Sequence, residues 1–438
     1  MSGLDSPADD LLVEESVSLP MLRKVALSSC IGSMVEWYDF FIYATASALV
    51  FNKLFFPNLS PLVGSLLALS TYATGFLARP IGGLVFGVIG DRQGRKAALV
   101  TTLLMVGIAT VLVGLLPTYD TIGIGGAIAL ILIRLVHGFG IGGEQANAIL
   151  ITFEHAPPRS RGFYSSLVQL GAPGGFVLPL AVFAVLEGFL SNDAFLAWGW
   201  RIPFLLSAFL VGIGMFIRLR ITESPLFQRQ HRRERHPLKA TLQQHPLAVL
   251  LGMGAKLAEA TVFNTYAVVY TAYAVSHGIA RDVMTQATLI AIVLELVTLP
   301  IFGLLSDRWG RKPLYALGCA LSVLAVFPSF WVIYDGHAAA IPATLVVMLA
   351  LAHSAMYAPQ ASFFSELFPI RMRASGLSFV VQIGSMIGSV GSLAAGWLLT
   401  LAGGGPWILA GYIGAIAALS FVCTLALPET APARLGQD

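Results

Sequence analysis

A charged string of ten residues occurs twice in the chain, each time between long apolar runs. Gly87–Lys96 reads GVIGDRQGRK and Gly303–Lys312 reads GLLSDRWGRK, so Asp91 and Asp307 are 216 residues apart in a chain of 438. A membrane chain that repeats a loop at half its length is typically built of two similar halves. The repeat therefore predicts two bundles that rock against each other around a central cavity, as many transporters do.

The composition is typical of a chain that lies in a lipid bilayer. Hydrophobic residues make up 56% of it and charged residues 11%, against roughly 25% in a soluble domain. The mean hydropathy is +0.79. Such a chain would aggregate in water unless most of its surface faced lipid, so the bilayer is an expected partner. The net charge of +3 gives no reason to expect a nucleic-acid partner.

Twelve apolar runs are long enough to cross a bilayer, which takes about 20 residues in a helix. They are 24–52, 61–89, 97–116, 122–152, 162–190, 199–219, 245–276, 284–305, 313–334, 340–366, 375–402 and 406–427. Runs of this length exclude barrel strands. The predicted fold class is an all-α membrane protein with twelve transmembrane helices in two pseudo-symmetric six-helix bundles.

Polar segments divide this sequence into five parts. We expect a disordered acidic tail (1–20), a first bundle (21–217), a basic linker (218–244), a second bundle (245–428) and a short tail (429–438). The linker, rich in Arg and His, is interpreted as a connection that also fixes topology. Recruitment of anionic lipid is the alternative for the same residues.

The distribution of basic residues predicts the orientation. With the N-terminus inside, 20 of the 26 Lys and Arg residues fall on the cytosolic side. Three lie outside (Lys53, Arg201 and Arg281) and three lie within the spans (Arg79, Arg134 and Lys256). The positive-inside rule therefore places both termini in the cytosol.

Several strings beyond the repeated loop resemble one transporter family. They are EWYDFFIY (36–43), FLARPIGG (76–83), WGWRIPFLL (198–206), ESPLF (223–227) and SELFPIRMRASG (365–376). With the repeated loops they resemble the major facilitator superfamily, and within it the metabolite:proton symporter family of α-ketoglutarate, citrate, shikimate and proline/betaine carriers. The resemblance implies a monomeric carrier of the bacterial inner membrane that imports a small organic acid together with protons.

The resemblance also implies a cytosolic gate built from the repeated loops. Asp91 would sit at a helix end, where it can face the positive N-terminus of a neighbouring helix or an arginine. The expected gate residues are Gly87, Asp91, Arg92, Arg95, Lys96, Glu154, Arg161, Asp307, Arg308, Arg311, Lys312, Glu366 and Arg373. The alternative is that these charges fix topology only.

Carboxylates inside the spans are the candidates for proton coupling, because burying a charge at membrane depth is costly. Glu36 and Asp39 are three residues apart, so they share one helix face and repel, which favours a shared proton. Asp39 is the first candidate. The other candidates are Glu144, which is seven residues after His137, Glu259, which is three after Lys256, and Glu295, which is either a proton site or the partner of a buried base.

Polar and aromatic side chains recur near the middle of six spans, where transporters bind substrate. The predicted substrate-binding residues are Tyr38, Arg79, Arg134, His137, Gln145, Asn147, Gln169, Lys256, Asn264, Tyr266, Tyr270, Tyr357, Gln360 and Gln382. The alternative for the aromatic members is helix packing. Preference for a carboxylate comes from the resemblance and from the ability of Arg and Lys to bind one.

The sequence gives no indication of catalysis. It contains no cluster of metal-ligating residues and no GxxxxGK[ST] loop for ATP, so neither an enzyme nor a metal or other cofactor is expected. Energy would come from a proton gradient. Within transport, the alternatives are a symporter of zwitterions such as betaine or proline, and a proton-driven efflux antiporter. A ligand sensor would be expected to carry a signalling domain, and this sequence has only short tails.

Overall fold

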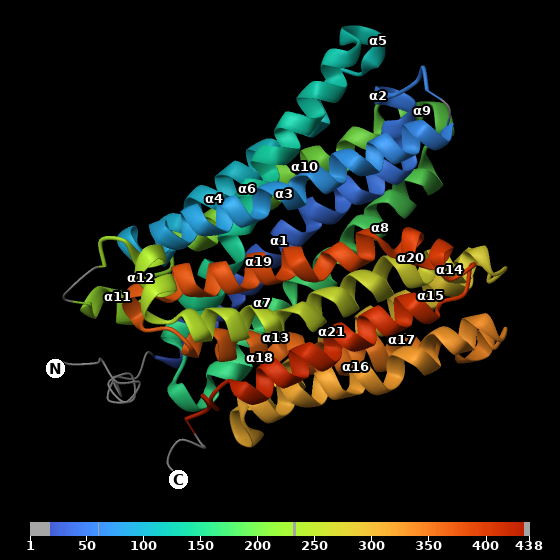
Figure 1. Ribbon diagram of the computed structural model, residues 1–438. Helices are drawn as coiled ribbons and strands as arrows, with labels where there is room; N and C mark the ends of the chain where they lie inside the picture. Colours follow the sequence, from blue (N-terminus) through green and yellow to red (C-terminus); the bar gives the residue numbers. More distant parts are fainter. Residues whose placement is uncertain (1–17, 60, 231–233, 433–438) are drawn as a thin grey trace.

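Two helical bundles lie side by side and diverge toward one end (Figure 1). The computed structural model describes residues 18–59, 61–230 and 234–432, and every regular element in these ranges is helical. The bundles meet at the end that carries α11 (Pro225–Arg229), α12 (Pro237–Gln244) and the repeated loops, which we call the basic end. The predicted fold class is confirmed.

The first bundle holds six long helical segments. They are α1 (Leu19–Ala46), α3 (Pro61–Gln93), α4 (Arg95–Leu115), α6 (Ile124–His155), the pair α7 (Arg161–Gln169) and α8 (Gly171–Phe189), and α10 (Ile202–Leu219). Short helices lie at the end opposite the basic end: α2 (Asn52–Phe55), α5 (Tyr119–Ile122) and α9 (Asn192–Ala197) (Figure 1).

The second bundle repeats this plan. Its segments are α13 (Pro246–Asn264) with α14 (Tyr270–Ser276), α15 (Arg281–Trp309), α16 (Arg311–Tyr334), α17 (Ile341–Leu345) with α18 (Ser354–Glu366), α19 (Arg373–Leu393) with α20 (Ala395–Leu401), and α21 (Trp407–Ala426). Two of these are interrupted by π-helical stretches, Thr265–Val269 and Val346–His353. Such stretches are frequent at functional sites, and both of these lie beside the cavity described below.

Helix length and hydropathy agree with the predicted spans. Among the described residues, ten helical segments are long and apolar enough to cross a membrane. The remaining two of the twelve are α1 and α3, with 28 and 33 residues. The predicted linker began at residue 218, whereas α10 continues to Leu219 and buries Arg218.

Glycines let α3 and α6 pack backbone to backbone. A Cβ atom on Gly138 would overlap the backbone of Gly75, and one on Gly142 would overlap the backbone of Arg79. Only glycine permits so close an approach, which is common between transmembrane helices. The crossing fixes Arg79 of α3 at the middle of the molecule.

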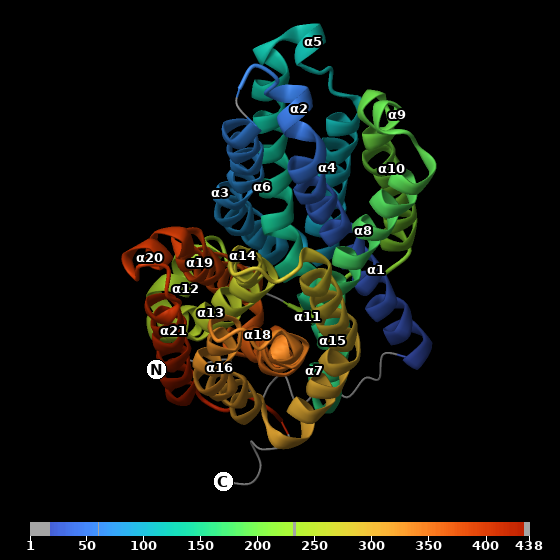
Figure 2. The same cartoon turned by 90° about the vertical axis from the view of Figure 1, so that its right-hand side faces the viewer.

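Helices α3 and α7 of the first bundle make the most extensive packing against the second bundle. α3 packs on α19, and α7 packs on α15 and α18. Figure 2 shows the first bundle above the second, with α7 lying against the lower bundle beside α15. Because α3 and α15 carry the two repeated loops at their ends, each repeat is brought to a helix of the opposite bundle.

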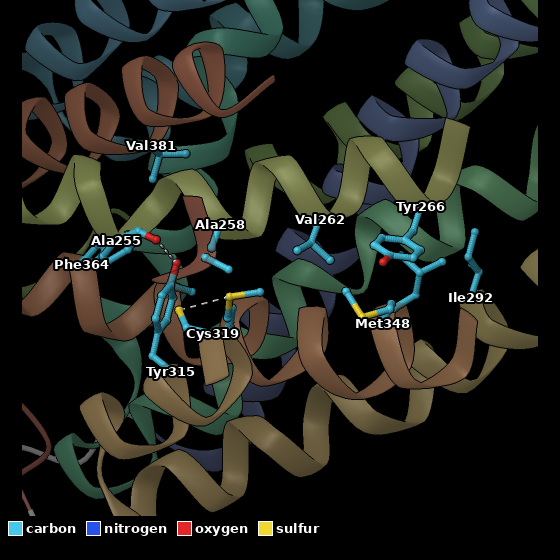
Figure 3. Packing of buried hydrophobic residues seen from close by; sticks show 14 of the residues in the cluster. Ala255, Ala258, Val262, Tyr266, Ile292, Tyr315, Cys319, Met348, Phe364 and Val381 are labelled. Atoms are coloured by element: carbon cyan, nitrogen blue, oxygen red, sulfur yellow. Dashed lines mark hydrogen bonds between the residues drawn. The ribbon is translucent and has the colours of Figure 1, made fainter. Parts of the chain in front are cut away.

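The core of the second bundle contains Tyr266 and Tyr270, two aromatic residues of the seventh span that were predicted to bind substrate. Tyr266 is fully buried, and its hydroxyl lies 2.5 Å from the hydroxyl of Ser329. The Tyr270 hydroxyl donates to the Ser329 carbonyl at 2.8 Å. Figure 3 shows Tyr266 among Val262, Met348 and other packed side chains, in the same row as the Tyr315 hydroxyl that donates to Ala255. The side chains of these two tyrosines therefore pack between helices of the second bundle.

Candidate functional site

A cavity of about 940 Å³, counted with its opening to the surface, lies between the two bundles. The first bundle contributes mostly aromatic rings: Trp37, Phe40, Phe41, Phe76 and Phe176, together with Arg79 and Gln145. The second contributes most of the polar groups: Lys256, Glu259, Asn264, His353, Tyr357, Gln382, Ser385 and Ser389. One wall is thus aromatic and the opposite wall is rich in hydrogen-bonding groups.

Arg79 lies within the aromatic wall. Its guanidinium carbon is 4.3 Å from the ring centre of Phe40, 4.9 Å from that of Phe76 and 5.6 Å from that of Trp37. Cation–π attraction of this kind can hold a guanidinium beside apolar surface where few waters solvate it. The charge of Arg79 is therefore presented to the cavity from a fixed position.

A network of ionisable groups lies on the opposite wall. Lys256 forms an ion pair with Glu259, and its Nζ donates to Gln360 Oε1 at 3.1 Å. The Nε2 atom of His353 lies 3.2 Å from Glu259 Oε1, and its Nδ1 atom lies 2.5 Å from Glu295 Oε1. The Lys256–Glu259 contact was predicted from spacing, whereas the pairing of Glu295 with His353 requires the fold.

Asp39 lies in a separate and smaller pocket inside the first bundle. Counted with its opening, the pocket has a volume of about 180 Å³, and it is also lined by Tyr43, Arg134 and His137. The Ser207 hydroxyl donates to Asp39 Oδ1 at 2.6 Å. Glu36, one turn away, is buried and lies within electrostatic range of Arg79, Arg218 and Glu144. The two carboxylates of the first span thus share a region close to the cavity but outside its lining.

His137 and Glu144 do not pair, although their spacing puts them on one helix face. Arg134 Nη1 lies 2.7 Å from His137 Nδ1, and since an arginine can only donate, this nitrogen is the acceptor. Glu144 forms its ion pair with Arg218, which also donates to the Leu99 carbonyl at 2.8 Å. Arg218, counted among the loop charges, is therefore a buried residue of the first bundle.

The predicted substrate residues fall into two groups. Those that line the cavity are Arg79, Gln145, Lys256, Asn264, Tyr357 and Gln382, and those outside its lining are Tyr38, Arg134, His137, Asn147, Gln169, Tyr266, Tyr270 and Gln360. In the second group, side chains bind other parts of the protein. Tyr38, for example, donates to the Pro203 carbonyl at 3.0 Å, and Asn147 donates to the Gly143 carbonyl at 2.8 Å.

Two glutamines in matching sequence contexts connect the bundles beside the cavity. Gln169 Nε2 donates to the Tyr357 carbonyl at 3.0 Å. Gln382 Nε2 donates to the Gly142 carbonyl at 3.0 Å. Each bond joins a helix of one bundle to a helix of the other, so both must break if the bundles separate here.

At the basic end, Asp91 joins the first bundle to the second. Its carboxylate accepts from the backbone N–H groups of Ala374 and Ser375, at 3.0 and 2.8 Å, in the first turn of α19. Arg95 lies 3.1 Å from both Asp91 and Glu154. Asp91 therefore has both of the partner types expected for it, a helix N-terminus and an arginine.

Asp307 makes the equivalent contacts in the opposite direction. It accepts from the N–H groups of Gly162 and Phe163, each at 2.8 Å, in the first turn of α7. Arg311 lies 2.7 Å from Asp307 and 3.4 Å from Glu366. Repeated loops thus close the basic end from both bundles.

The other expected gate residues surround these contacts. Arg373 is 3.7 Å from Glu154, and the Arg161 guanidinium lies 4.5 Å from the Phe153 ring centre. The backbone of Gly87 lies so close to α19 that a Cβ atom would be 3.0 Å from the Ser378 hydroxyl. Arg92 and Arg308 lie at the exposed surface, whereas Lys96 and Lys312 are half-buried.

Two carboxylates missed by the sequence analysis complete the basic end. Glu223 accepts from the N–H groups of Arg95 and Lys96, each at 3.0 Å, at the start of α4. Glu429 accepts from the N–H groups of Arg311 and Lys312, at 2.9 and 3.2 Å, at the start of α16. Their signal was present in the strings ESPLF (223–227) and LPET (427–430), where a Glu follows the last long helix of each half.

Family profiles match both halves of the chain. The family described as Sugar (and other) transporter matches residues 25–251, and the Major Facilitator Superfamily profile matches residues 251–438. The inner membrane metabolite transport protein YhjE of Escherichia coli K12 is 38% identical over 95% of this chain and 96% of that protein. The shikimate transporter of the same strain is 37% identical over 86% and 87%, and its proline/betaine transporter is 33% identical over 94% and 84%.

The fold is similar to that of a solved transporter. The MFS proton:xylose symporter XylE bound to 6-bromo-6-deoxy-D-glucose superimposes with a TM-score of 0.78 and 18% identity, over 94% of this chain and 97% of that one. Two six-helix bundles around a central cavity define a multi-pass membrane transporter rather than an enzyme. The chain belongs to the major facilitator superfamily, and its resemblance to the metabolite transporters of the inner membrane is confirmed.

Proposed function

We propose that this protein is a proton-coupled symporter that imports a small organic carboxylate by alternating access. The observation that carries the proposal is the cavity lining. Two cations, Arg79 and Lys256, and one carboxylate, Glu259, face the same space from opposite bundles. These three charges leave the lining with one excess positive charge, which favours an anion in surroundings that few waters reach.

The walls suit a carboxylate with a compact, partly apolar body. Rings of the first bundle supply apolar contact, while Asn264, Ser385 and Ser389 of the second offer hydrogen bonds to hydroxyl groups. The name of the related shikimate transporter supports a cyclic hydroxy-acid as the first compound to test. The monomer is the transporting unit in this proposal, since the cavity lies within one chain.

Asp39 is proposed as the residue that carries the coupling proton, ahead of Glu36. It is 1% exposed, and the Ser207 hydroxyl that donates to it is a neutral group. Glu144 has the buried arginine partner Arg218, which favours a permanent charge. The proton gradient, rather than ATP, is the proposed energy source, and the basic end is proposed to lie in the cytosol.

Transport by purified protein in proteoliposomes tests the proposal. With the outside acidic, shikimate and other carboxylates should accumulate inside, and Arg79→Gln should abolish uptake. Arg281→Gln is the matched control, because Arg281 is exposed at the start of α15. Uptake that ignores the pH gradient, or an Arg79→Gln variant with wild-type uptake, would contradict the proposal.

A zwitterion symporter is the second candidate. The rings of Phe41, Phe176 and Phe263 line the cavity and could face a quaternary ammonium group. A related protein is named a proline/betaine transporter. Glycine betaine in the same uptake assay distinguishes the two candidates. Substrate that leaves preloaded liposomes as protons enter would instead indicate a proton-driven efflux antiporter.

A further inference from the structure

The ring of His353 is held in one orientation between two carboxylates. It stacks on Tyr357, with ring centres 4.9 Å apart and planes at 22°. It also contacts Phe263, whose ring centre is 5.2 Å from its own. Its two nitrogens are thereby directed at Glu259 and Glu295, at 3.2 and 2.5 Å. All three residues are at most 5% exposed.

The two hydrogen bonds of the His353 ring require one more proton than a neutral imidazole and two ionised carboxylates carry. A neutral imidazole donates from one nitrogen only, and an ionised carboxylate accepts only. If His353 were neutral and both carboxylates ionised, one nitrogen would face an oxygen lone pair without a proton between them. A doubly protonated His353 satisfies both contacts.

Charge balance leads to the same conclusion. Lys256 contributes one positive charge, and Glu259 and Glu295 contribute two negative charges. Within this hydrogen-bonded cluster, protonated His353 makes the sum zero, whereas neutral His353 leaves the cluster with a net charge of one negative unit at membrane depth, which is costly. The ionisable groups that the neighbouring helices present are Tyr315 and Cys319 of α16, Tyr357 of α18 and, from the first bundle, Arg79 and Glu36.

The four groups connect the cavity to a buried position. Lys256, Glu259 and His353 line the cavity, while Glu295 lies behind His353 and outside the lining. A carboxylate that binds the Lys256 ammonium adds a negative charge beside Glu259. The proton on His353 then becomes harder to remove, because the cluster would otherwise carry a larger uncompensated charge.

We propose that His353 and Glu295 form a proton-binding site in the second bundle, separate from Asp39. Protonation of the His353–Glu295 site is linked, through Glu259 and Lys256, to the presence of a carboxylate in the cavity. The linkage rests on the proposed function; the proton site itself does not. In the resting protein His353 is an imidazolium, and deprotonation of this site weakens carboxylate binding as the pH rises.

Nuclear magnetic resonance of ¹⁵N-histidine-labelled protein in liposomes tests the site without substrate. His353→Gln identifies the His353 signals by removing them. In the wild-type protein at neutral pH both ring nitrogens should be protonated. In Glu295→Gln the ring should be neutral at the same pH, because Lys256 and Glu259 then balance each other. Glu187→Gln, an exposed change, should leave the signals unaltered.

Lys256→Met tests the linkage in the same experiment. Removing the ammonium imitates its neutralisation by a bound carboxylate, so His353 should stay doubly protonated to a pH higher by about one unit or more. A neutral His353 in the wild-type protein would refute the proposed proton-binding site. This result depends on the folding of only one variant, His353→Gln, which is used to assign the signals. An unchanged titration in Lys256→Met overturns the linkage. A chain that takes up no carboxylate would refute the proposed function and leave these readings valid.

Discussion

Asp91 and Asp307 make the same contact in opposite directions. Each carboxylate accepts two backbone N–H groups from the first turn of a helix in the other bundle, α19 for Asp91 and α7 for Asp307. Each also pairs with the arginine four residues later in its own repeat, Arg95 or Arg311. The sequence repeat thus becomes a two-fold related closure of the basic end.

Neutralising either aspartate should slow transport while sparing substrate binding. Asp91→Asn and Asp307→Asn weaken a charge-assisted bond to a helix N-terminus, which we expect to destabilise the closed basic end by about 1–2 kcal/mol, a factor of roughly 5–30 in the balance between states. Initial uptake rates and ligand-induced thermal shifts measure the two effects separately. Asp120→Asn, at an exposed position, is the control; wild-type rates in both gate variants would contradict a gating role.

Cysteine labelling tests the orientation of the molecule. In a background without the three native cysteines, single cysteines at the exposed positions Asp120, Asp193 and Asp335 should react with an impermeant reagent in intact cells. Cysteines at Gln93 and Arg159, at the basic end, should react only after permeabilisation. The reverse pattern would place the basic end outside and would change which side the gate closes.

The Glu144–Arg218 ion pair should contribute strongly to the stability of the first bundle. Arg218→Met leaves Glu144 buried without its partner, a change that typically costs about 3–5 kcal/mol of the free energy of unfolding. The double variant with Glu144→Gln should recover part of this loss, since neither charge then remains. Unfolding in detergent measures the cycle, with the exposed Arg220→Met as control. Equal stability of Arg218→Met and wild type would show that the pair is dispensable.

The spans and the closure of the basic end could be predicted because they follow from local properties. Run length and hydropathy determine which segments cross the bilayer, and a carboxylate at a helix end has few kinds of partner. Arg218 could not be placed this way. The positive-inside rule sums charges near the membrane and does not distinguish which helix face carries them. The burial of Arg218 also depends on Gly32 of α1, which leaves the space that the Arg218 guanidinium fills.

The cavity was only partly predictable because polar residues in a span can face either a cavity or a neighbouring helix. The hydroxyls of Tyr266 and Tyr270 form hydrogen bonds within the second bundle, whereas Tyr357 reaches the cavity. The pairing of Glu295 with His353 depends on how α15 packs against the tenth span. Residues 58 positions apart give no periodic signal for such a contact.

The assignment of the coupling proton to Asp39 can be tested by separating uphill transport from exchange. Asp39→Asn keeps an oxygen that can accept from the Ser207 hydroxyl, so the local structure should be retained, but the side chain cannot take up a proton. We expect pH-driven accumulation in proteoliposomes to be abolished. Exchange of labelled for unlabelled substrate between two loaded sides should continue, because in exchange the carrier returns with substrate bound and the proton-dependent return of the empty carrier is not needed. Asp193→Asn, exposed on α9, should accumulate substrate like the wild type. An Asp39→Asn variant that still accumulates substrate at the normal proton cost would exclude Asp39, and the coupling proton would then have to be carried by another buried carboxylate, with Glu144 the next to test.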